Sequence, residues 1–169
     1  PMLVAAIAVP YHVPGLGAPL RLSPEVLADL FLGRITRWDD PRVAALNPGA
    51  RLPALDVRVV HRAEGSGTTF VLTDYLARVS PAWAAGPGRG KDVRWPVGVG
   101  GRGTEGVAGL VQRTPGAIGY MEATAARRSG LPMAEVRNRA GAFVAPSVAS
   151  VGAAAVAVTG TAPAGTDFR

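Results

Sequence analysis

A β-branched strand that runs through a glycine-rich turn into a helix sets the strongest limit on the fold of this chain. Residues 56–61 (DVRVVH) alternate in polarity, which predicts a strand. From Thr68 onward apolar residues recur at helical spacing, which predicts a helix of about three turns that ends before Ser80. Gly65 and Gly67 lie between the two elements. This unit predicts an α/β domain, because strands that alternate with helices are typical of such folds.

Further short segments extend this pattern along the chain. The apolar runs 2–9, 117–121 and 134–138 predict additional strands. Together with the helices between them, they predict a mixed or mostly parallel sheet flanked by helices. The glycine-rich segment 86–106 predicts a long connector, in which residues 95–98 pack against the domain.

Proline, glycine and capping residues mark the expected helix ends. Ser23 before Pro24 predicts the start of a helix that stops at Gly33, and Asp40 predicts the cap of a second helix that ends at residues 47–49. Other helices are predicted at 105–113 after a Thr104 cap, at 122–129 before Gly130, and from Pro146 through Ala155. Trp38 is expected to anchor the turn between the first two helices in the core.

The composition excludes several classes of protein. Hydrophobic residues make up 48% of the 169 residues, enough for one packed core and too many for a disordered tail. No apolar run approaches the roughly 20 residues of a membrane span, so none is expected. The first residues show no signal-peptide pattern, so a leader has been removed or the chain is a piece of a longer one. The absence of cysteine excludes disulfides and thiolate chemistry.

The charge favours an anionic partner. The formal net charge is +6, and Lys91 is the only lysine among 18 basic residues, so arginine dominates. Many of these arginines are expected to be solvated charges without a ligand. They are dispersed, and aromatic residues are only 6% of the chain, so no nucleic-acid partner is expected.

The turn at residues 62–69 (RAEGSGTT) is the candidate binding site. Glycines at a helix start leave the first amides of the helix accessible to an anion. Arg62 adds a guanidinium from the end of the strand, and the hydroxyls of Ser66, Thr68 and Thr69 add further donors. The alternative is that Ser66 only caps the helix and the glycines only make a tight turn. No P-loop lysine follows, and the third glycine of a dinucleotide motif would fall at Phe70, so neither nucleotide motif is met.

Two further features lie near or beyond this turn. Glu64 is expected to orient the Arg62 guanidinium, with a solvated surface glutamate as the alternative. Residues 98–103 (GVGGRG) with Arg102 could form a second anion-binding loop, or simply fold the connector.

Catalytic chemistry is poorly supported. His12 and His61 are the only histidines, and His61 is badly placed to act as a base for Ser66 because adjacent strand residues point to opposite faces. No spacing suggests a metal site. We therefore predict no catalytic residue, no metal and no cofactor.

The chain resembles the PstS family, the phosphate-binding proteins of the bacterial phosphate ABC importer. The motifs that carry the resemblance, in the family's order, are 32–40 (LGRITRWDD), 47–49 (NPG), 62–70 (RAEGSGTTF), 95–98 (WPVG) and 111–120 (VQRTPGAIGY). The resemblance as a whole extends from about Val4 to Pro146. The resemblance implies a type II periplasmic-binding-protein-like fold of two α/β lobes with the anion between them, of which this chain is similar to the second lobe alone.

The resemblance also implies site residues, partners and a location. Arg62 would be the guanidinium ligand of inorganic phosphate, with Ser66, Gly67 and Thr68 as hydroxyl and amide donors. Glu64 stands where the family usually has Asp, which is one methylene shorter. The implied partners are a complementary first lobe on a longer or separate chain and an ABC permease, and the implied location is extracytoplasmic.

The resulting expectation is a non-catalytic phosphate-binding lobe. Residues 1–155 would form the lobe, and residues 156–169 a flexible tail or the return to a missing lobe. The alternatives are an interaction or sensory domain that has lost transport, a lobe for another oxyanion, and an enzyme acting on a phosphorylated substrate.

Overall fold

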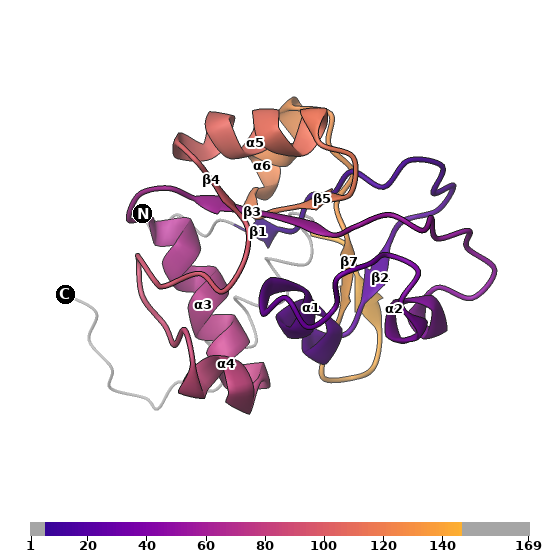
Figure 1. The fold of residues 1–169 in the computed structure, drawn as a ribbon, viewed down its shortest axis with the longest axis horizontal. Helices are drawn as coiled ribbons and strands as arrows, with labels where there is room; N and C mark the ends of the chain where they lie inside the picture. Colours follow the sequence, from indigo (N-terminus) through magenta and orange to yellow (C-terminus); the bar gives the residue numbers. More distant parts are fainter. Residues whose placement is uncertain (1–5, 147–169) are drawn as a thin grey trace, which may run out of the picture.

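The computed structural model describes residues 6–146, which form an α/β structure (Figure 1). The strands are β1 (Ile7–Ala8), β2 (Arg21–Leu22), β3 (Arg58–Arg62), β4 (Val99–Gly101), β5 (Ala117–Ile118), β6 (Met121–Glu122), β7 (Glu135–Arg137) and β8 (Phe143–Val144). The helices are α1 (Pro24–Phe31), α2 (Pro41–Leu46), α3 (Gly67–Val79), α4 (Pro81–Ala85), α5 (Gly103–Arg113) and α6 (Ala123–Arg128).

A parallel sheet in the order β4-β3-β5 lies at the centre of the fold. Arg62 of β3 aligns with Gly101 of β4, and Arg58 aligns with Ala117 of β5. Helices α5 and α6 lie on one side of this sheet, and α1, α3 and α4 lie on the other (Figure 1). This layering is what a strand buried on both faces requires.

Two smaller sheets complete the architecture. Strands β2 and β7 pair in parallel and β7 and β8 in antiparallel, while β1 and β6 form an antiparallel pair. The prediction of an α/β domain with a mixed or mostly parallel sheet flanked by helices is therefore confirmed in its class, although the strands are divided among three sheets. No helix within residues 6–146 combines the length and the apolar character that a bilayer span would need.

The predicted helix caps are present. The Ser23 hydroxyl accepts a hydrogen bond from the Val26 amide at 3.2 Å, and Asp40 accepts one from the Arg42 amide at 2.9 Å. Helix α1 ends at Phe31, and Gly33 follows with φ of +73°, a conformation that glycine adopts without strain. These local signals worked because a cap involves only neighbouring residues.

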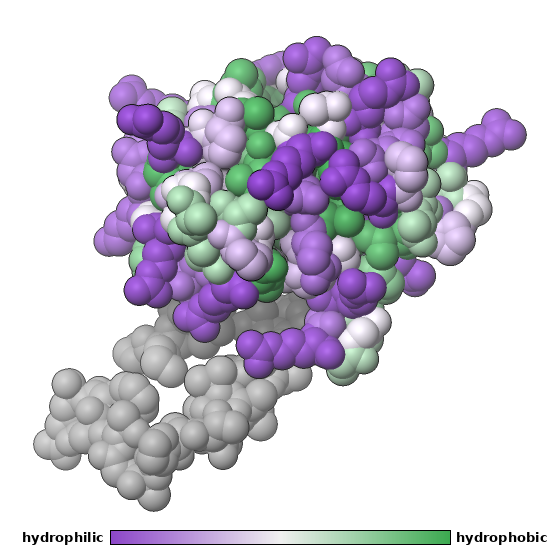
Figure 2. Space-filling view, turned by 60° about the horizontal axis from the view of Figure 1, so that its bottom comes forward, coloured by the Kyte–Doolittle hydropathy of each residue, from purple (hydrophilic) through white to green (hydrophobic). Residues whose placement is uncertain are grey.

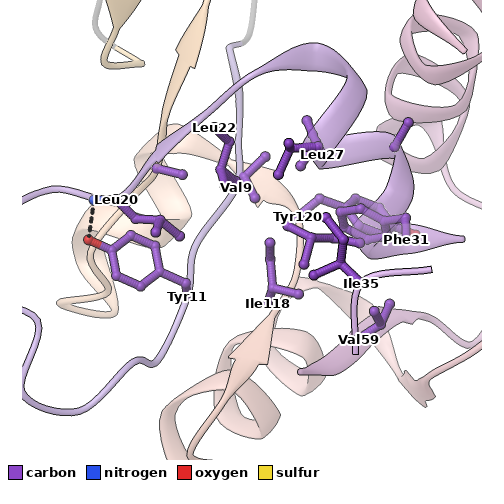
Figure 3. Packing of buried hydrophobic residues seen from close by; sticks show 14 of the residues in the cluster. Val9, Tyr11, Leu20, Leu22, Leu27, Phe31, Ile35, Val59, Ile118 and Tyr120 are labelled. Carbon is purple, nitrogen blue, oxygen red and sulfur yellow. Dashed lines mark hydrogen bonds between the residues drawn. The ribbon is translucent and has the colours of Figure 1, made fainter. Parts of the chain in front are cut away.

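The apolar side chains form one cluster on each side of the central sheet. The larger cluster gathers the buried residues that face α1 and α3, among them those labelled in Figure 3. The smaller one joins Val60 of β3 to Val107 and Val111 of α5. Trp38 is fully buried, as predicted, and its indole nitrogen donates to the Gly116 carbonyl at 3.0 Å.

Hydrophilic side chains cover most of the face drawn in Figure 2. Many arginines make ion pairs with nearby carboxylates at the surface, such as Arg37 with Asp39 at 2.8 Å and Arg78 with Asp74 at 2.8 Å. Such exposed pairs contribute little stability. These arginines remain largely exposed, and their charges are matched by carboxylates within the chain.

Several predicted boundaries were wrong or incomplete. The run 117–121 is split into β5 and β6, which pair with different strands, because Gly119 between them donates its amide to the Pro10 carbonyl. Strand β1 covers only Ile7–Ala8 of the run 2–9, of which residues 1–5 lie outside the described part. Strand 134–138 and helix 122–129 are present in shortened form as β7 and α6.

The connector 86–106 was the least accurately predicted segment. It contains strand β4 and the start of α5, and the short helix α4 precedes it with Ser80 as its cap. Thr104 does not cap α5, because the helix already begins at Gly103, whose amide is bound by the distant Glu64. Of residues 95–98 only Trp95 packs against the core, and the other three are exposed.

The expected helix from Pro146 and the expected tail 156–169 fall on residues outside the described part of the chain. The division at residue 155 therefore remains a prediction.

Candidate anion-binding site

The site lies where strand β3 ends and helix α3 begins. Arg62 is the last residue of β3, and Gly67 is the first residue of α3. Because β3 is parallel to both of its neighbours, the turn lies at the carboxyl edge of the sheet. This is the edge at which open α/β sheets bind ligands.

The Arg62 guanidinium is held in place and still retains donors. Its Nε donates to Glu64 Oε1 at 2.8 Å, a second nitrogen donates to the same oxygen, and a third reaches Thr68 Oγ1 at 3.4 Å. The side chain is 15% exposed. A guanidinium carries five N–H groups, so some remain for a ligand after these three hydrogen bonds.

The first turn of α3 presents amides without partners. Ser66 caps the helix by accepting from the Thr69 amide at 3.3 Å, while its own amide donates to the Lys91 carbonyl at 2.8 Å. The amides of Gly67 and Thr68 donate no hydrogen bond within residues 6–146. A side chain at Gly67 would meet nothing within 4 Å, so the backbone there is open to an approaching group.

The hydroxyls of the turn are close to these amides. Ser66 Oγ and Thr68 Oγ1 are hydrogen-bonded to each other, and both residues are buried. The structure thus brings together the four residues proposed from the sequence, Arg62, Ser66, Gly67 and Thr68. A guanidinium, two hydroxyls and two free amides at a helix N-terminus can together bind a small oxyanion.

Glu64 links the site to helix α5. Its carboxylate accepts hydrogen bonds from the Arg62 guanidinium and from the Gly103 amide, the latter at 3.0 Å to Oε1. The Arg62 hydrogen bond, helped by the one from Gly103, holds the pKa of Glu64 below its ordinary value. Glu64 therefore pairs with Arg62, as the first of the two expectations has it, while 39% of its side chain stays exposed.

The second glycine-rich loop binds a negatively charged group of the chain itself, the Glu64 carboxylate. Of residues 98–103, Gly103 directs its amide to the Glu64 carboxylate, as an anion-binding loop would. Arg102 is the N-cap residue of α5 but makes no side-chain cap. The loop binds Glu64 and supports Arg62 indirectly.

Tyr120 belongs to one of the motifs that carry the family resemblance, and no role in the site was predicted for it. Its hydroxyl accepts a hydrogen bond from the Arg62 amide at 3.0 Å and lies 2.6 Å from Thr69 Oγ1. Tyr120 is 1% exposed. The only signal in the sequence for such a contact was the tyrosine side chain itself, because a buried tyrosine hydroxyl needs a polar partner.

Neither a nucleophile–base pair nor a metal cluster is present in the described part of the chain. His61 Nδ1 donates to the Arg62 carbonyl at 3.0 Å, and its ring stacks on Trp95 with centroids 4.8 Å apart. The hydroxyl of Ser66 bonds instead to its neighbours in the turn. No group of three or more His, Cys, Asp or Glu residues suited to a metal occurs within residues 6–146.

Comparison with known proteins places this chain in a family. A family model described as a PBP superfamily domain matches residues 1–167. The phosphate-binding protein PstS of Pasteurella multocida is 52% identical over 136 residues, which cover 80% of this chain and 40% of that protein. PstS of Methanocaldococcus jannaschii is 42% identical over a match that covers 96% of this chain and 44% of that protein.

A solved structure agrees with the sequence comparison. The high-affinity periplasmic phosphate-binding protein PfluDING, bound with phosphate, matches with a TM-score of 0.67 and 26% identity, over 94% of this chain and 44% of that one. The chain spans less than half the length of each of these proteins. The chain therefore belongs to the PBP superfamily, and the relatives that it resembles there are PstS phosphate-binding proteins.

Proposed function

We propose that this chain binds inorganic phosphate, without catalysis, as one lobe of the binding protein of an ABC phosphate importer. One observation carries the proposal: the Arg62 guanidinium lies beside the unpaired amides of Gly67 and Thr68 at the start of α3. Relatives named phosphate-binding protein, and a similar structure that holds phosphate, support phosphate as the anion. The resemblance to the PstS family adds a permease to the proposed partners, and the description of the similar phosphate-bound protein as periplasmic supports an extracytoplasmic location.

We infer that a complementary lobe closes over the anion. The chain covers 40% of the Pasteurella relative, which leaves room for a second lobe in such proteins. Phe70 and Val71, in the first turns of α3, are 42% and 51% exposed. Apolar side chains of this size beside a polar site are suited to contact with another protein surface.

Selectivity among oxyanions depends on proton acceptors. Phosphate at neutral pH carries a proton that sulfate lacks, and recognition of that proton needs an acceptor. The carboxylate nearest the site, Glu64, is already engaged by Arg62 and Gly103. We therefore expect this lobe alone to discriminate only weakly between phosphate and sulfate.

Titration calorimetry of the purified chain with phosphate and with sulfate tests the proposal. We expect phosphate to bind in the millimolar range, and Arg62→Ala to weaken binding roughly 10- to 100-fold because charge-assisted hydrogen bonds are lost. Arg58→Ala is the matched control, since it removes the same charge from the other end of β3, where Arg58 pairs with Asp56. Binding that is absent, or equal in all three proteins, would contradict the proposal.

A further inference from the structure

Tyr120 connects the two elements that carry the anion site. Its hydroxyl accepts a hydrogen bond from the Arg62 amide at the end of β3, at 3.0 Å. The same hydroxyl hydrogen-bonds to Thr69 Oγ1 in the first turn of α3, at 2.6 Å. Arg62 supplies the guanidinium, and Thr69 directly follows the residues with free amides. A single phenol group therefore contacts both the strand that ends in Arg62 and the first turn of α3.

The surroundings of the ring leave this hydroxyl little freedom. Trp95 stacks on Tyr120 with centroids 5.7 Å apart, and Phe31 packs against it edge-on at 6.2 Å. Tyr120 follows β5, which pairs directly with β3. Burial also raises the pKa of Tyr120, so the hydroxyl keeps its proton at neutral pH. One proton and free lone pairs suit it to bind both partners at once.

We propose that Tyr120 is a positioning residue for the anion site, which acts by holding Arg62 at a set distance from the amides of Gly67 and Thr68. The inference deepens the proposed function and rests on it. In this role Tyr120 needs no contact with the anion, because its hydroxyl is engaged by the Arg62 amide and by Thr69 Oγ1. Its effect is to keep the donors arranged before the anion arrives, which lowers the cost of ordering them on binding.

Tyr120→Phe tests this role, with Tyr11→Phe as the matched control. Tyr11 is also buried, and its hydroxyl accepts one backbone amide, that of Leu20, at 3.0 Å. Figure 3 shows Tyr11 and Tyr120 on opposite sides of the same apolar cluster. Both changes keep the ring and leave one amide without its partner, and Tyr120→Phe also leaves the Thr69 hydroxyl without one, so Tyr120→Phe should lower stability somewhat more than the control.

Phosphate affinity distinguishes the two variants. We expect Tyr120→Phe to weaken phosphate binding by roughly tenfold, as the loss of an ordering hydrogen bond predicts. Tyr11→Phe should stay within about twofold of the unmodified chain, since it lies away from the site. Equal affinities in the two variants would overturn the inference.

A double-mutant cycle with Thr69→Val tests whether Tyr120 acts through α3. Thr69→Val removes the same hydrogen bond from the other side. If the two residues act together, the double variant should lose roughly the same affinity as the weaker-binding single variant. Fully additive losses would show that Tyr120 does not act through this hydrogen bond.

A measurement without phosphate separates failure of this inference from failure of the proposed function. The Arg62 Nε–H signal in nitrogen-15 NMR reports the guanidinium held by Glu64. Tyr120→Phe should broaden or shift that signal, and Tyr11→Phe should leave it unchanged. If the unmodified chain binds no phosphate, the proposed function fails while this signal still tests the positioning. An unchanged signal in Tyr120→Phe would overturn the positioning itself.

Discussion

Arg62 is restrained by a carboxylate and can still bind a ligand. Glu64 accepts hydrogen bonds from its Nε and from a second nitrogen, so the guanidinium cannot rotate freely. The side chain remains 15% exposed. The same carboxylate accepts the Gly103 amide. Glu64 thus links helix α5 to the guanidinium at the end of strand β3, and loss of its negative charge would weaken this link.

The pH dependence of Glu64 follows from that link. Its pKa is lowered first by the Arg62 hydrogen bond, so the carboxylate stabilises the folded chain above its unfolded pKa. That stability should be lost as the pH falls through the lowered folded pKa. Carbon-13 NMR titration of Glu64 should give a midpoint below its ordinary value of 4.5. Arg62→Ala should raise this midpoint, and an unchanged midpoint would contradict the assigned cause.

At the scale of the element, α1 and α3 begin with the same cap but different first turns. Ser23 and Ser66 each accept one amide, at 3.2 and 3.3 Å. Helix α1 continues with Pro24 and Glu25, which remove a donor and add a negative charge. Helix α3 continues with Gly67 and has no acidic residue in its first turn. Of these two helices, α3 therefore presents the start that is suited to an anion.

Alanine at each cap should separate stability from binding. We expect Ser23→Ala and Ser66→Ala each to lower the free energy of unfolding by about 1 kcal/mol, measured by urea denaturation. Phosphate affinity should fall in Ser66→Ala, which also loses a hydroxyl of the site, and should not change in Ser23→Ala. Equal affinities would show that the Ser66 hydroxyl serves as a cap alone.

Contact between β4 and α5 depends on glycine. A Cβ at Gly101 would lie 2.7 Å from the Val107 nitrogen, so alanine there would push the helix away from the sheet. We expect Gly101→Ala to lower the free energy of unfolding by about 1–3 kcal/mol in urea denaturation. Gly17→Ala is the control, because a Cβ at Gly17 meets nothing within 4 Å. A loss no larger than in the control would contradict the close contact.

At the scale of the whole molecule, the site lies at an edge of the fold and not within it. The buried clusters fill both sides of the central sheet, while Gly67 and the side chains of Phe70 and Val71 face outward. An anion bound at the start of α3 would keep part of its surface in water. Much of the affinity is therefore expected from the proposed second lobe.

A comparison of the chain with a two-lobed form tests this arrangement. We expect a longer protein that carries the complementary lobe to bind phosphate at least about tenfold more tightly than this chain, in calorimetry under the same conditions. Arg62→Ala should weaken both forms. Equal affinities of the two forms would mean that one lobe holds the anion by itself.

The parts of this fold that could be predicted are those set by neighbouring residues. The caps Ser23 and Asp40 were predicted because a side chain reaches an amide two or three residues away. Strand β3 and helix α3 were predicted because polarity repeats with the period of the backbone. The start of α5 could not be, because the group that binds Gly103 lies 39 residues earlier.

By itself, the sequence determined the candidate ligands of the site: Arg62, the glycines and the hydroxyls occur within one continuous turn, whose chemistry is visible in the order of residues. Tertiary structure decided which of their donors are free and what holds them. The Lys91 carbonyl accepts the hydrogen bond of the Ser66 amide. Glu64, which also binds the Gly103 amide, orients the Arg62 guanidinium. The Tyr120 hydroxyl contacts both strand β3 and helix α3. Hydrogen bonds between residues far apart in the chain form only when packing brings them together, and no local pattern encodes them.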